Sequence, residues 1–458
     1  MKCFLWIWLA VVSLVCFSVQ AQEGTTNLFD GKTLKGWKRL TGTADFRVSG
    51  DAIVGTTVAN SPNSFLVSEK KFSNFILDLD ILVEDTSMNS GVQIRSHYNP
   101  AGNAGKGQVF GLQVEVDPSA RKWSGGIYDE GRRGWLYPVS LNSHAADAFQ
   151  LGIYNHYRIE CIGQQTRTWI NGKSVAFLVD NADQEGFVAI QVHAVGNGGQ
   201  AGKKVFFKNI RIHTLALKPA ELPEGIFVVN TMPNQLTSYE RAGGWRLLFD
   251  GKTAAGWVGA YKNEFPARGW VVEHGILRVL SSEGKEAANG GDIVTTAQYR
   301  AFDLSFEFKL TPGANSGVKY FVTLQENNSG SAIGLEYQLL DDQLHPDAKL
   351  GTNGDRTLAS LYDLIPSQKQ ERFVHPIGDW NSGRIIVFPN NHVEHYLNGI
   401  KVLSYERGGQ AFRDLVALSK YKIWPNFGEA AQGHILLQDH GTEVSFRSIK
   451  IRELEAKH

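Results

Sequence analysis

A hexapeptide occurs twice in this chain of 458 residues, once near the start of each half. Leu28–Thr33 and Leu248–Thr253 both read Leu-Phe-Asp-Gly-Lys-Thr, and a Gly-Trp pair follows each of them after two residues. Five further pairs of segments keep one order in both halves: Asn89–Val92 with Asn315–Val318, Gly111–Leu112 with Gly334–Leu335, Ile127–Asp129 with Leu361–Asp363, Ile170–Lys173 with Leu397–Ile400, and Gly186–His193 with Gly433–His440. Shared landmarks in one order indicate an internal duplication. We expect two tandem copies of one domain, each about 200 residues long.

Each copy reads as a series of short strands. Apolar and polar residues alternate in runs that Gly, Asn, Ser and Pro separate, and Asn74–Val83 is the clearest example. Asn171-Gly172 and Asn398-Gly399 have the composition of tight hairpin turns. Helical periodicity is almost absent from the first copy. This pattern predicts an all-β fold with one β-sandwich in each copy.

The repeat also sets the expected domain limits. The first sandwich is expected over residues 27–217 and the second over residues 245–455. The connector, residues 218–244, contains three prolines, and we expect it to pack partly against one domain. The longest irregular stretch, Asp341–Gly378, lies in the second copy, and long ordered loops often carry function.

Residues 1–21 are typical of a secretory signal peptide. Lys2 precedes the apolar stretch Phe4–Val19, and Val19–Ala21 places small residues at the cleavage position. A membrane anchor and a lipid-attachment site at Cys16 are the alternatives, but the apolar run is short for a membrane span. We expect a periplasmic or secreted protein without a membrane span.

Composition narrows the expected partners further. The 46 basic and 46 acidic residues give no net charge, so the chain carries no electrostatic signal for nucleic acid or an anionic membrane. After signal cleavage Cys161 is the one remaining cysteine, which excludes an internal disulfide. The alternation around Cys161 predicts a small buried apolar residue rather than a catalytic thiol.

His193 and His440 recur at one position of the repeat. Each ends an apolar strand at the same distance from the glycine that begins it, Gly186 or Gly433. Two readings stay open. The imidazole is either satisfied by a backbone carbonyl at the edge of the core, or it acts as a general acid or base near neutral pH.

Polar residues alternate along a second pair of equivalent strands. Gln113, Glu115 and Asp117 share one strand face in the first copy, and Glu336 and Gln338 share one in the second. Each copy therefore presents a carboxylate and an amide, with their positions exchanged. These groups suit a ligand face that binds sugar hydroxyls, a proton or a metal, and the alternative is a solvated outer face.

Other candidates have weaker support. Asp341, Asp342, His345 and Asp347 are hard ligands for a divalent cation, although their spacing matches no strong metal motif. Further side chains suited to polarising a carbonyl or binding substrate are Tyr128, Arg132, Arg133 and Trp135 in the first copy and Lys319, Arg356 and Tyr362 in the second. Asn89 and Asn315 are expected to make turns, as are the Asp-Gly pairs at Asp30 and Asp250.

An ordered set of motifs resembles the 3-keto-disaccharide hydrolase family, also described as 3-keto-glucoside 1,2-lyase/3-keto-2-hydroxyglucal hydratase. In the second copy the motifs are Leu248–Thr253, Gly256-Trp257, Asn315–Gly317, Glu336–Gln338, Ala359–Tyr362, Leu397–Gly399 and Gln438–Gly441. In the first copy they are Gly126–Glu130, Gly134–Leu136 and Gln191–His193. Together the copies cover nearly the whole mature chain.

The resemblance implies two concanavalin A-like jelly-roll sandwiches, a carbohydrate substrate and export in glycan-degrading bacteria. It places Glu336, Gln338, Tyr362 and His440 in the site of the second domain. It places Glu115, Tyr128 and His193 in that of the first. The first copy departs from the pattern, because Gln191–Ala194 replaces the Gln-Asp-His-Gly ending.

The implied reaction cleaves a 3-keto-glycoside. A ketone at C3 acidifies the C2 proton, a base removes it, and the C1 substituent leaves; water then adds back. We predict His440 as base or acid with Glu336 as its partner, and Tyr362 or a bound divalent cation at the enolate oxygen. His193 and Glu115 are the equivalents in the first copy. Predicted substrate-binding residues are Gln113, Tyr128, Arg133, Trp135, Lys319, Gln338 and Asp341.

Three other functions fit the same sequence. A glycan-binding protein without turnover has the same fold class, and fold does not fix function. A conventional retaining glycosidase would need two carboxylates roughly 5 Å apart. In a mixed case, the second domain catalyses and the first binds glycan.

Overall fold

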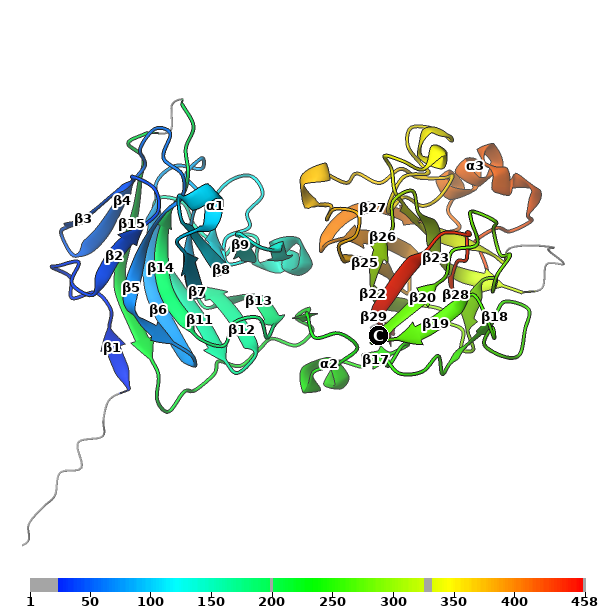
Figure 1. Ribbon diagram of the computed structural model, residues 1–458, viewed down its shortest axis with the longest axis horizontal. Helices are drawn as coiled ribbons and strands as arrows, with labels where there is room; N and C mark the ends of the chain where they lie inside the picture. Colours follow the sequence, from blue (N-terminus) through cyan, green and yellow to red (C-terminus); the bar gives the residue numbers. More distant parts are fainter. Residues whose placement is uncertain (1–23, 198–200, 325–331, 456–458) are drawn as a thin grey trace, which may run out of the picture.

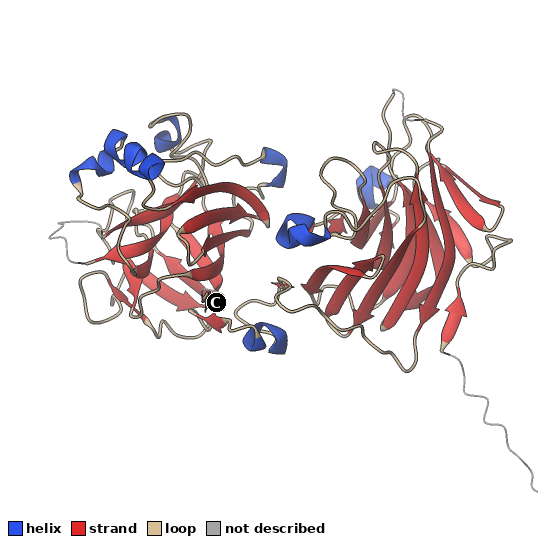
Figure 2. Cartoon of the chain, turned by 180° about the vertical axis from the view of Figure 1, so that it is seen from behind, coloured by secondary structure: helices blue, strands red, loops and turns tan. Residues whose placement is uncertain are grey.

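The computed structural model describes residues 24–197, 201–324 and 332–455, which form two β-rich domains side by side (Figure 1). The predicted signal peptide lies outside the described residues. Strands dominate both domains (Figure 2) and fall into four sheets, two in each half of the chain. The all-β prediction with two tandem sandwiches is confirmed. None of the described helices is long and apolar enough to cross a membrane.

The first domain pairs a nine-stranded sheet with a seven-stranded sheet. The nine strands are β1 (Thr25–Asn27), β3 (Asp45–Ser49), β4 (Ala52–Thr56), β6 (Phe75–Val83), β11 (Asn155–Ile162), β12 (Gln165–Ile170), β13 (Lys173–Val179), β15 (Lys204–His213) and β16 (Val229–Asn230). The seven strands run in the order β10 (Gly134–Tyr137), β9 (Ile127–Glu130), β8 (Gln108–Val116), β7 (Ser90–Asn99), β14 (Gly186–Val192), β5 (Ser64–Phe72) and β2 (Trp37–Leu40). Two short helices, α1 (Gly102–Gly105) and the 3₁₀ helix η1 (Val139–Ala145), lie in its loops.

The second domain repeats this plan with fewer strands. Its eight-stranded sheet contains β17 (Arg246–Leu247), β19 (Trp270–Glu273), β20 (Ile276–Val279), β22 (Phe302–Leu310), β25 (Asn381–Val387), β26 (His392–Leu397), β27 (Ile400–Glu406) and β29 (Val444–Glu453). Its five-stranded sheet runs in the order β18 (Trp257–Gly259), β21 (Ile293–Thr295), β28 (His434–Leu437), β23 (Asn315–Thr323) and β24 (Ile333–Leu340). The loops carry α3 (Gln410–Leu418) and the 3₁₀ helices η2 (Pro346–Lys349), η3 (Glu371–Phe373) and η4 (Lys420–Ile423).

Strand alternation fills the core between the sheets. Leu112, Val114 and Val116 of β8 belong to the apolar core of the first domain, and Leu335 and Leu339 of β24 belong to that of the second. Burying one such side chain contributes about 1.5–3 kcal/mol. The intervening polar residues of β8 and β24 therefore face away from the core, as predicted.

The duplicated hexapeptide builds the same turn twice. The Asp30 carboxylate accepts backbone N–H bonds from Lys32 and Thr33 at 2.8 and 2.6 Å, and Asp250 makes the equivalent bonds at 2.8 and 2.7 Å. The indole N–H groups of Trp37 and Trp257 donate to the carbonyls of the first leucine of each hexapeptide. The hexapeptide is therefore structural, as its Asp-Gly composition predicted.

The connector differs from the prediction that it packs against one domain. Its strand β16 extends the first domain, because it pairs in parallel with β13. Its helix α2 (Ser238–Ala242) reaches the second domain, where Lys450 Nζ lies 2.6 Å from Glu240 Oε1. The connector thus packs against both domains.

Candidate active site

A cavity of about 380 Å³ opens on the outer side of the five-stranded sheet in the second domain. The strands β23 and β24 form its floor, and η4 and the segment after β28 form its walls. Five residues that the sequence singled out line it together: Lys319, Glu336, Gln338, Tyr362 and His440. Glu286, Asn315, Ala332, Ile333, Gly334, Lys420, Tyr421, Ile423, Trp424 and Gln438 complete the lining.

The repeated Asn-Ser-Gly motif supports the cavity floor. Ser316 Oγ donates to the carbonyl of Gln438 at 2.8 Å and so ties β23 to the segment that follows β28. A Cβ at Gly317 would overlap the carboxyl oxygen of Glu336, so glycine leaves the space in which that side chain lies. Asn315 lines the cavity, whereas its place before Ser-Gly predicts only a turn.

Glu336 is the central acid of this cavity. The residue is 5% exposed, and Gln338 donates its amide N–H to Glu336 Oε1 at 3.2 Å when its amide is oriented to satisfy its neighbours. Burial raises the pKa of Glu336. The ammonium of Lys319 opposes that rise, because its Nζ lies 4.0 Å from Oε2, and Lys420 and His440 oppose it as well.

His440 lies at the rim of the cavity on a braced turn. Its Nε2 faces the amide nitrogen of Asn315 at 3.5 Å. The preceding side chain, Asp439, is fully buried and accepts backbone N–H bonds from Gly291 and Gly441 at 3.0 and 3.2 Å. These bonds fix the turn that carries the imidazole. The structure therefore brings His440 and Glu336 to one cavity.

Tyr362 lines the cavity, but its hydroxyl is already engaged. It donates to Asp347 Oδ2 at 2.8 Å, and Arg356 in turn pairs with Asp347 at 2.9 Å. Burial and the bond to Asp347 raise the pKa of Tyr362 above its usual range. The ammonium of Lys420 lies 4.3 Å from the centre of the tyrosine ring. Lys420 is therefore a cation of the site that sequence reasoning missed.

Lys420, Glu286 and Trp424 escaped prediction because no repeat marks them. Lys420 and Trp424 lie in the connection between β27 and β28, which is much longer than its counterpart between β13 and β14 in the first copy. The same connection contains α3, a helix that the strand-based reading also missed. A positional comparison of the two copies cannot find residues that only one copy has.

The candidate cation ligands Asp341, Asp342, His345 and Asp347 are not gathered into a metal site among the residues described. Among them, no group of three or more histidine, cysteine or acidic side chains is arranged to hold a metal ion. Asp341 lies outside the cavity lining and accepts backbone N–H bonds from Gly313 and Gln343. Asp342 pairs with Lys369 at 2.9 Å, and Asp347 is held by Tyr362 and an arginine. These carboxylates are therefore already bound to side chains and backbone N–H groups of the protein.

The first domain has an equivalent cavity of about 240 Å³, which is lined from strands β8, β9 and β10 and from the loops beside them. Its lining includes the predicted residues Gln113, Glu115, Tyr128, Trp135 and His193, together with Asn63, Asn89, Arg121 and Glu130. Asn89 and Gln113 donate to the two oxygens of Glu115 at 2.6 and 3.0 Å. Burial nevertheless raises the pKa of Glu115 to about 7. Nδ1 of His193 lies 2.8 Å from the carbonyl oxygen of Ala194, which matches the non-catalytic reading of this histidine.

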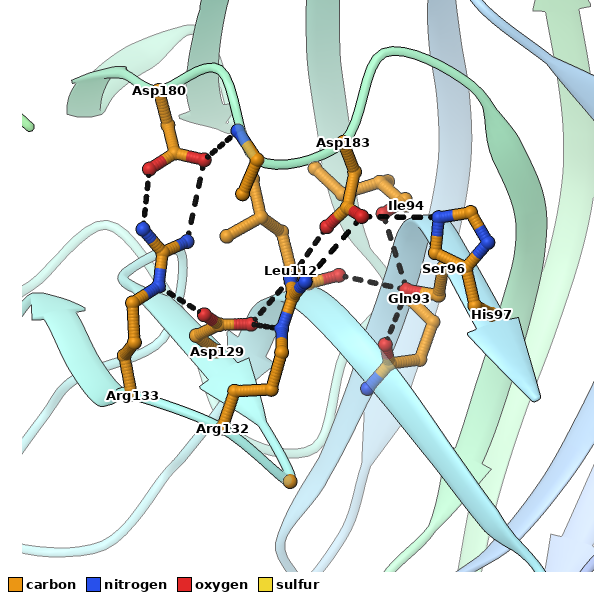
Figure 3. A network of polar contacts seen from close by, with 12 residues as sticks. Gln93, Ile94, Ser96, His97, Leu112, Asp129, Arg132, Arg133, Asp180 and Asp183 are labelled. Carbon is orange, nitrogen blue, oxygen red and sulfur yellow. Dashed lines mark hydrogen bonds and ion pairs between the residues drawn. The ribbon is translucent and has the colours of Figure 1, made fainter. Parts of the chain in front are cut away.

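Arg133 does not reach this cavity, contrary to its predicted role in substrate binding. Figure 3 shows Arg132 and Arg133 bound on either side of the buried Asp129. Arg133 also pairs with Asp180 at 2.6 Å, and Arg132 pairs with Asp183. The two aspartates come from the short connection between β13 and β14, so their proximity was not visible in the sequence.

Comparisons with known proteins found one family model that matches both halves of the chain, and several similar proteins. The model of the 3-keto-alpha-glucoside-1,2-lyase-like domain matches residues 24–213 and, again, 244–452. A 3-keto-disaccharide hydrolase of Bacteroides thetaiotaomicron is 36% identical over 235 residues, which cover 47% of this chain and 80% of that protein. A candidate glycosyl hydrolase of Parabacteroides distasonis is 29% identical, with a TM-score of 0.42 over 49% of this chain and 100% of its own. A carbohydrate-binding module of Bacillus subtilis is 16% identical, with a TM-score of 0.27 over 39% of this chain and 95% of its own.

Proposed function

Since both halves of the chain belong to the family of 3-keto-alpha-glucoside-1,2-lyase-like domains, we propose that the protein is a carbohydrate-active enzyme that cleaves 3-keto-glycosides. The second domain is its catalytic domain. The observation that carries this proposal is that a carboxyl group, an imidazole and two ammonium groups line one cavity, at Glu336, His440, Lys319 and Lys420.

Cleavage of a 3-keto-glycoside needs these groups. A base takes the proton from C2, and the electron pair of the C–H bond forms an enolate with the C3 carbonyl. When the carbonyl re-forms, the C1–C2 double bond appears and the C1 oxygen leaves with a proton from an acid. Water then adds its hydroxyl to C1 and its proton to C2, so the net change is hydrolysis.

The cavity offers one residue for each task. Glu336 is the base, because a carboxylate of raised pKa accepts a proton more readily than an exposed one. The ammonium of Lys319 lies beside it and stabilises the enolate oxygen. Lys420 adds a second positive charge from η4, at the wall of the cavity. His440 lies at the rim and protonates the departing oxygen.

Assays of a 3-keto-glucoside and its unoxidised parent test this proposal. We expect turnover of the keto sugar alone, with a primary isotope effect when C2 carries deuterium. Glu336→Gln should lower kcat by about 10²–10⁴-fold, the usual contribution of a general base. Circular dichroism of the variant is the control for folding. Including a chelator in the same assay tests whether a divalent cation takes part.

Two outcomes would replace this function with another. Turnover of the parent glycoside, without a C2 isotope effect, would favour a conventional glycoside hydrolase with two carboxylates. Binding of either sugar without turnover would favour a glycan-binding protein.

We also propose that the protein is exported. Residues 1–21 combine a positive start, an apolar stretch and small residues at the cleavage position. Sequencing the N-terminus of the protein from the native host would show whether the mature chain starts after Ala21.

A further inference from the structure

We propose that the cavity of the first domain is a binding site for an unoxidised, uncharged saccharide, which it holds without cleaving it. The choice of a saccharide rests on the proposed function. The step beyond that function is that the two copies have separate tasks, with glycan capture in the first domain and elimination in the second.

The lining of this cavity matches the chemistry of a pyranose. Three side-chain amides line it, at Asn63, Asn89 and Gln113. Each donates one N–H to a glutamate of the cavity, and each amide group carries a second N–H that a hydroxyl group can accept. Tyr128 and Trp135 provide an aromatic wall on which the C–H face of a sugar ring can lie, with their ring centres 5.4 Å apart. A polar cavity with one aromatic wall is suited to a sugar better than to an apolar ligand.

The cation required for elimination is missing from this floor. In the strand register, Gln93 lies opposite Gln113 in the first domain where Lys319 lies opposite Glu336 in the second. The Gln93 amide donates to Gln113 Oε1 at 2.9 Å and carries no charge. An enolate oxygen over this floor would therefore have no ammonium beside it.

The remaining charges in the cavity do not replace that lysine. Arg121 is the one cation among the residues that line the cavity, and its guanidinium is 2.7 Å from the buried Asp117. Glu115 and Glu130 both have raised pKa values, because burial disfavours their charged forms. These carboxyl groups can hydrogen-bond to neutral hydroxyls, and in their charged forms they repel a negative charge that develops nearby.

The histidine of the first domain also lacks the brace that holds its counterpart. Val192 precedes His193, whereas the buried Asp439 fixes the turn before His440. Nδ1 of His193 faces a backbone carbonyl, so one ring nitrogen is already engaged. These differences leave the first domain with the hydrogen-bonding side chains of the site but without its catalytic arrangement.

The second domain supports the aromatic wall through Trp123, which packs behind Trp135. Trp135 packs against Trp123 with ring centres 4.6 Å apart, and Phe373 of the second domain packs against Trp123 at 5.4 Å. Ser140 Oγ also donates to the carbonyl of Gly399 across the junction at 2.8 Å. Any test of this site therefore requires the full mature chain.

Calorimetric titration tests the proposal. The protein in the sample cell is the full mature chain that carries Glu336→Gln, so that turnover is suppressed. The probes are the unoxidised disaccharides maltose, cellobiose and trehalose. We expect at least one of them to bind with one site per chain. Adding Trp135→Ala should weaken this binding at least tenfold, and Trp135→Phe should retain part of it because the ring packing persists. Thermal melting of each variant is the control for folding.

The outcomes separate this inference from the proposed function. If the native chain turns over a 3-keto-glucoside but none of the three disaccharides binds, the inference is wrong and the function stands. Binding that is insensitive to both Trp135→Ala and Glu115→Gln also overturns the inference. So does keto-sugar turnover that survives Glu336→Gln and is lost in Glu115→Gln, because the first domain would then be the catalyst. If the native chain turns over no keto sugar, the proposed function fails whatever the binding result.

Discussion

The cavity of each domain lies over the strand that carries its carboxyl–amide pair, β8 in the first and β24 in the second, and these strands pair with the equivalent strands β7 and β23. Both have an Asn-Ser-Gly segment on one strand and a carboxyl–amide pair on the other. They differ where Gln93 replaces Lys319 and where Val192 replaces Asp439. The two domains therefore share the hydrogen-bonding residues of the cavity floor. They differ in a few charged residues placed in or beside it.

A second difference lies in the connection between β13 and β14 in the first domain and its counterpart between β27 and β28 in the second. In the first domain this connection is short, and its aspartates Asp180 and Asp183 bind the arginine pair (Figure 3). In the second domain the longer connection carries Lys420 into the cavity. The same position in the fold therefore neutralises cations in one copy and supplies a cation in the other.

Exchanging the floor residue should give the largest effect. Lys319→Gln imports the residue of the first domain into the second, and we expect kcat on a 3-keto-glucoside to fall about 10²-fold, because one preorganised partner of the enolate oxygen is lost. Steady-state kinetics with a folding control measures this. The reciprocal Gln93→Lys is the matched variant in the first domain, in a chain inactivated by Glu336→Gln. A loss below threefold for Lys319→Gln would break the comparison.

The pH dependence of stability should distinguish Glu115 of the first cavity from Glu336 of the second. The pKa of Glu115 is about 7 in the folded chain against a usual 4.5, so the folded state retains a proton that the unfolded state releases between these values. Stability therefore falls as the pH rises from about 4.5 to about 7 and changes no further above it. Glu115→Gln removes this loss, so the stability of the variant relative to the native chain should be about 3 kcal/mol more favourable at pH 8 than at pH 4.

Urea unfolding at both pH values measures this difference. Glu336→Gln is the matched variant, and its gain should be smaller because Lys319 opposes the rise in the pKa of Glu336. Equal gains for the two variants would contradict the electrostatic difference between the floors.

The serine hydrogen bond that both cavity floors share should give the smallest effect on stability, and the effect should be equal in the two domains. Ser90 Oγ donates to the carbonyl of Gln191 at 2.6 Å, and Ser316 Oγ donates to that of Gln438 at 2.8 Å. Both serines are fully buried. Ser90→Ala and Ser316→Ala should each lower the free energy of unfolding of their own domain by about 1 kcal/mol, the net value of one buried hydrogen bond. Urea unfolding followed separately in each domain checks this, and a clear inequality would show that the motif is not equivalent in the two copies.

Much of the fold was visible in the sequence because it depends on local patterns. Alternation along Asn74–Val83 places Phe75, Leu77, Leu79 and Ile81 in the core, and the observed strand begins one residue later, at Phe75, and ends at Val83. The polar faces of β8 and β24 were also predicted, since alternate residues must share a face. Duplication then brought Glu336 and His440 together as candidates, although Glu336 lies on β24 and His440 on the turn after β28.

The errors arose where a side chain's partner is distant in sequence. Arg133 looked free for a ligand until folding placed Asp180 beside it. Asp341 looked like a metal ligand, but its oxygens accept the N–H groups of neighbouring turns. Lys420 was missed because it has no counterpart in the other copy. The local pattern of a strand predicts which face of the sheet a side chain lies on. It does not predict which distant residues will form hydrogen bonds or ion pairs with that side chain.

The exchanged order of acid and amide has a geometric consequence. Glu115 lies opposite Gly91, whereas Glu336 lies opposite Lys319, so the two acids are offset by two positions along equivalent strands. At about 3.3 Å per residue, this offset is roughly 6–7 Å, comparable to the breadth of a pyranose. A hexose lying in the same orientation in both hollows would thus meet the two acids at opposite edges of its ring. The regiochemistry of one copy cannot be transferred to the other by restoring a lysine alone.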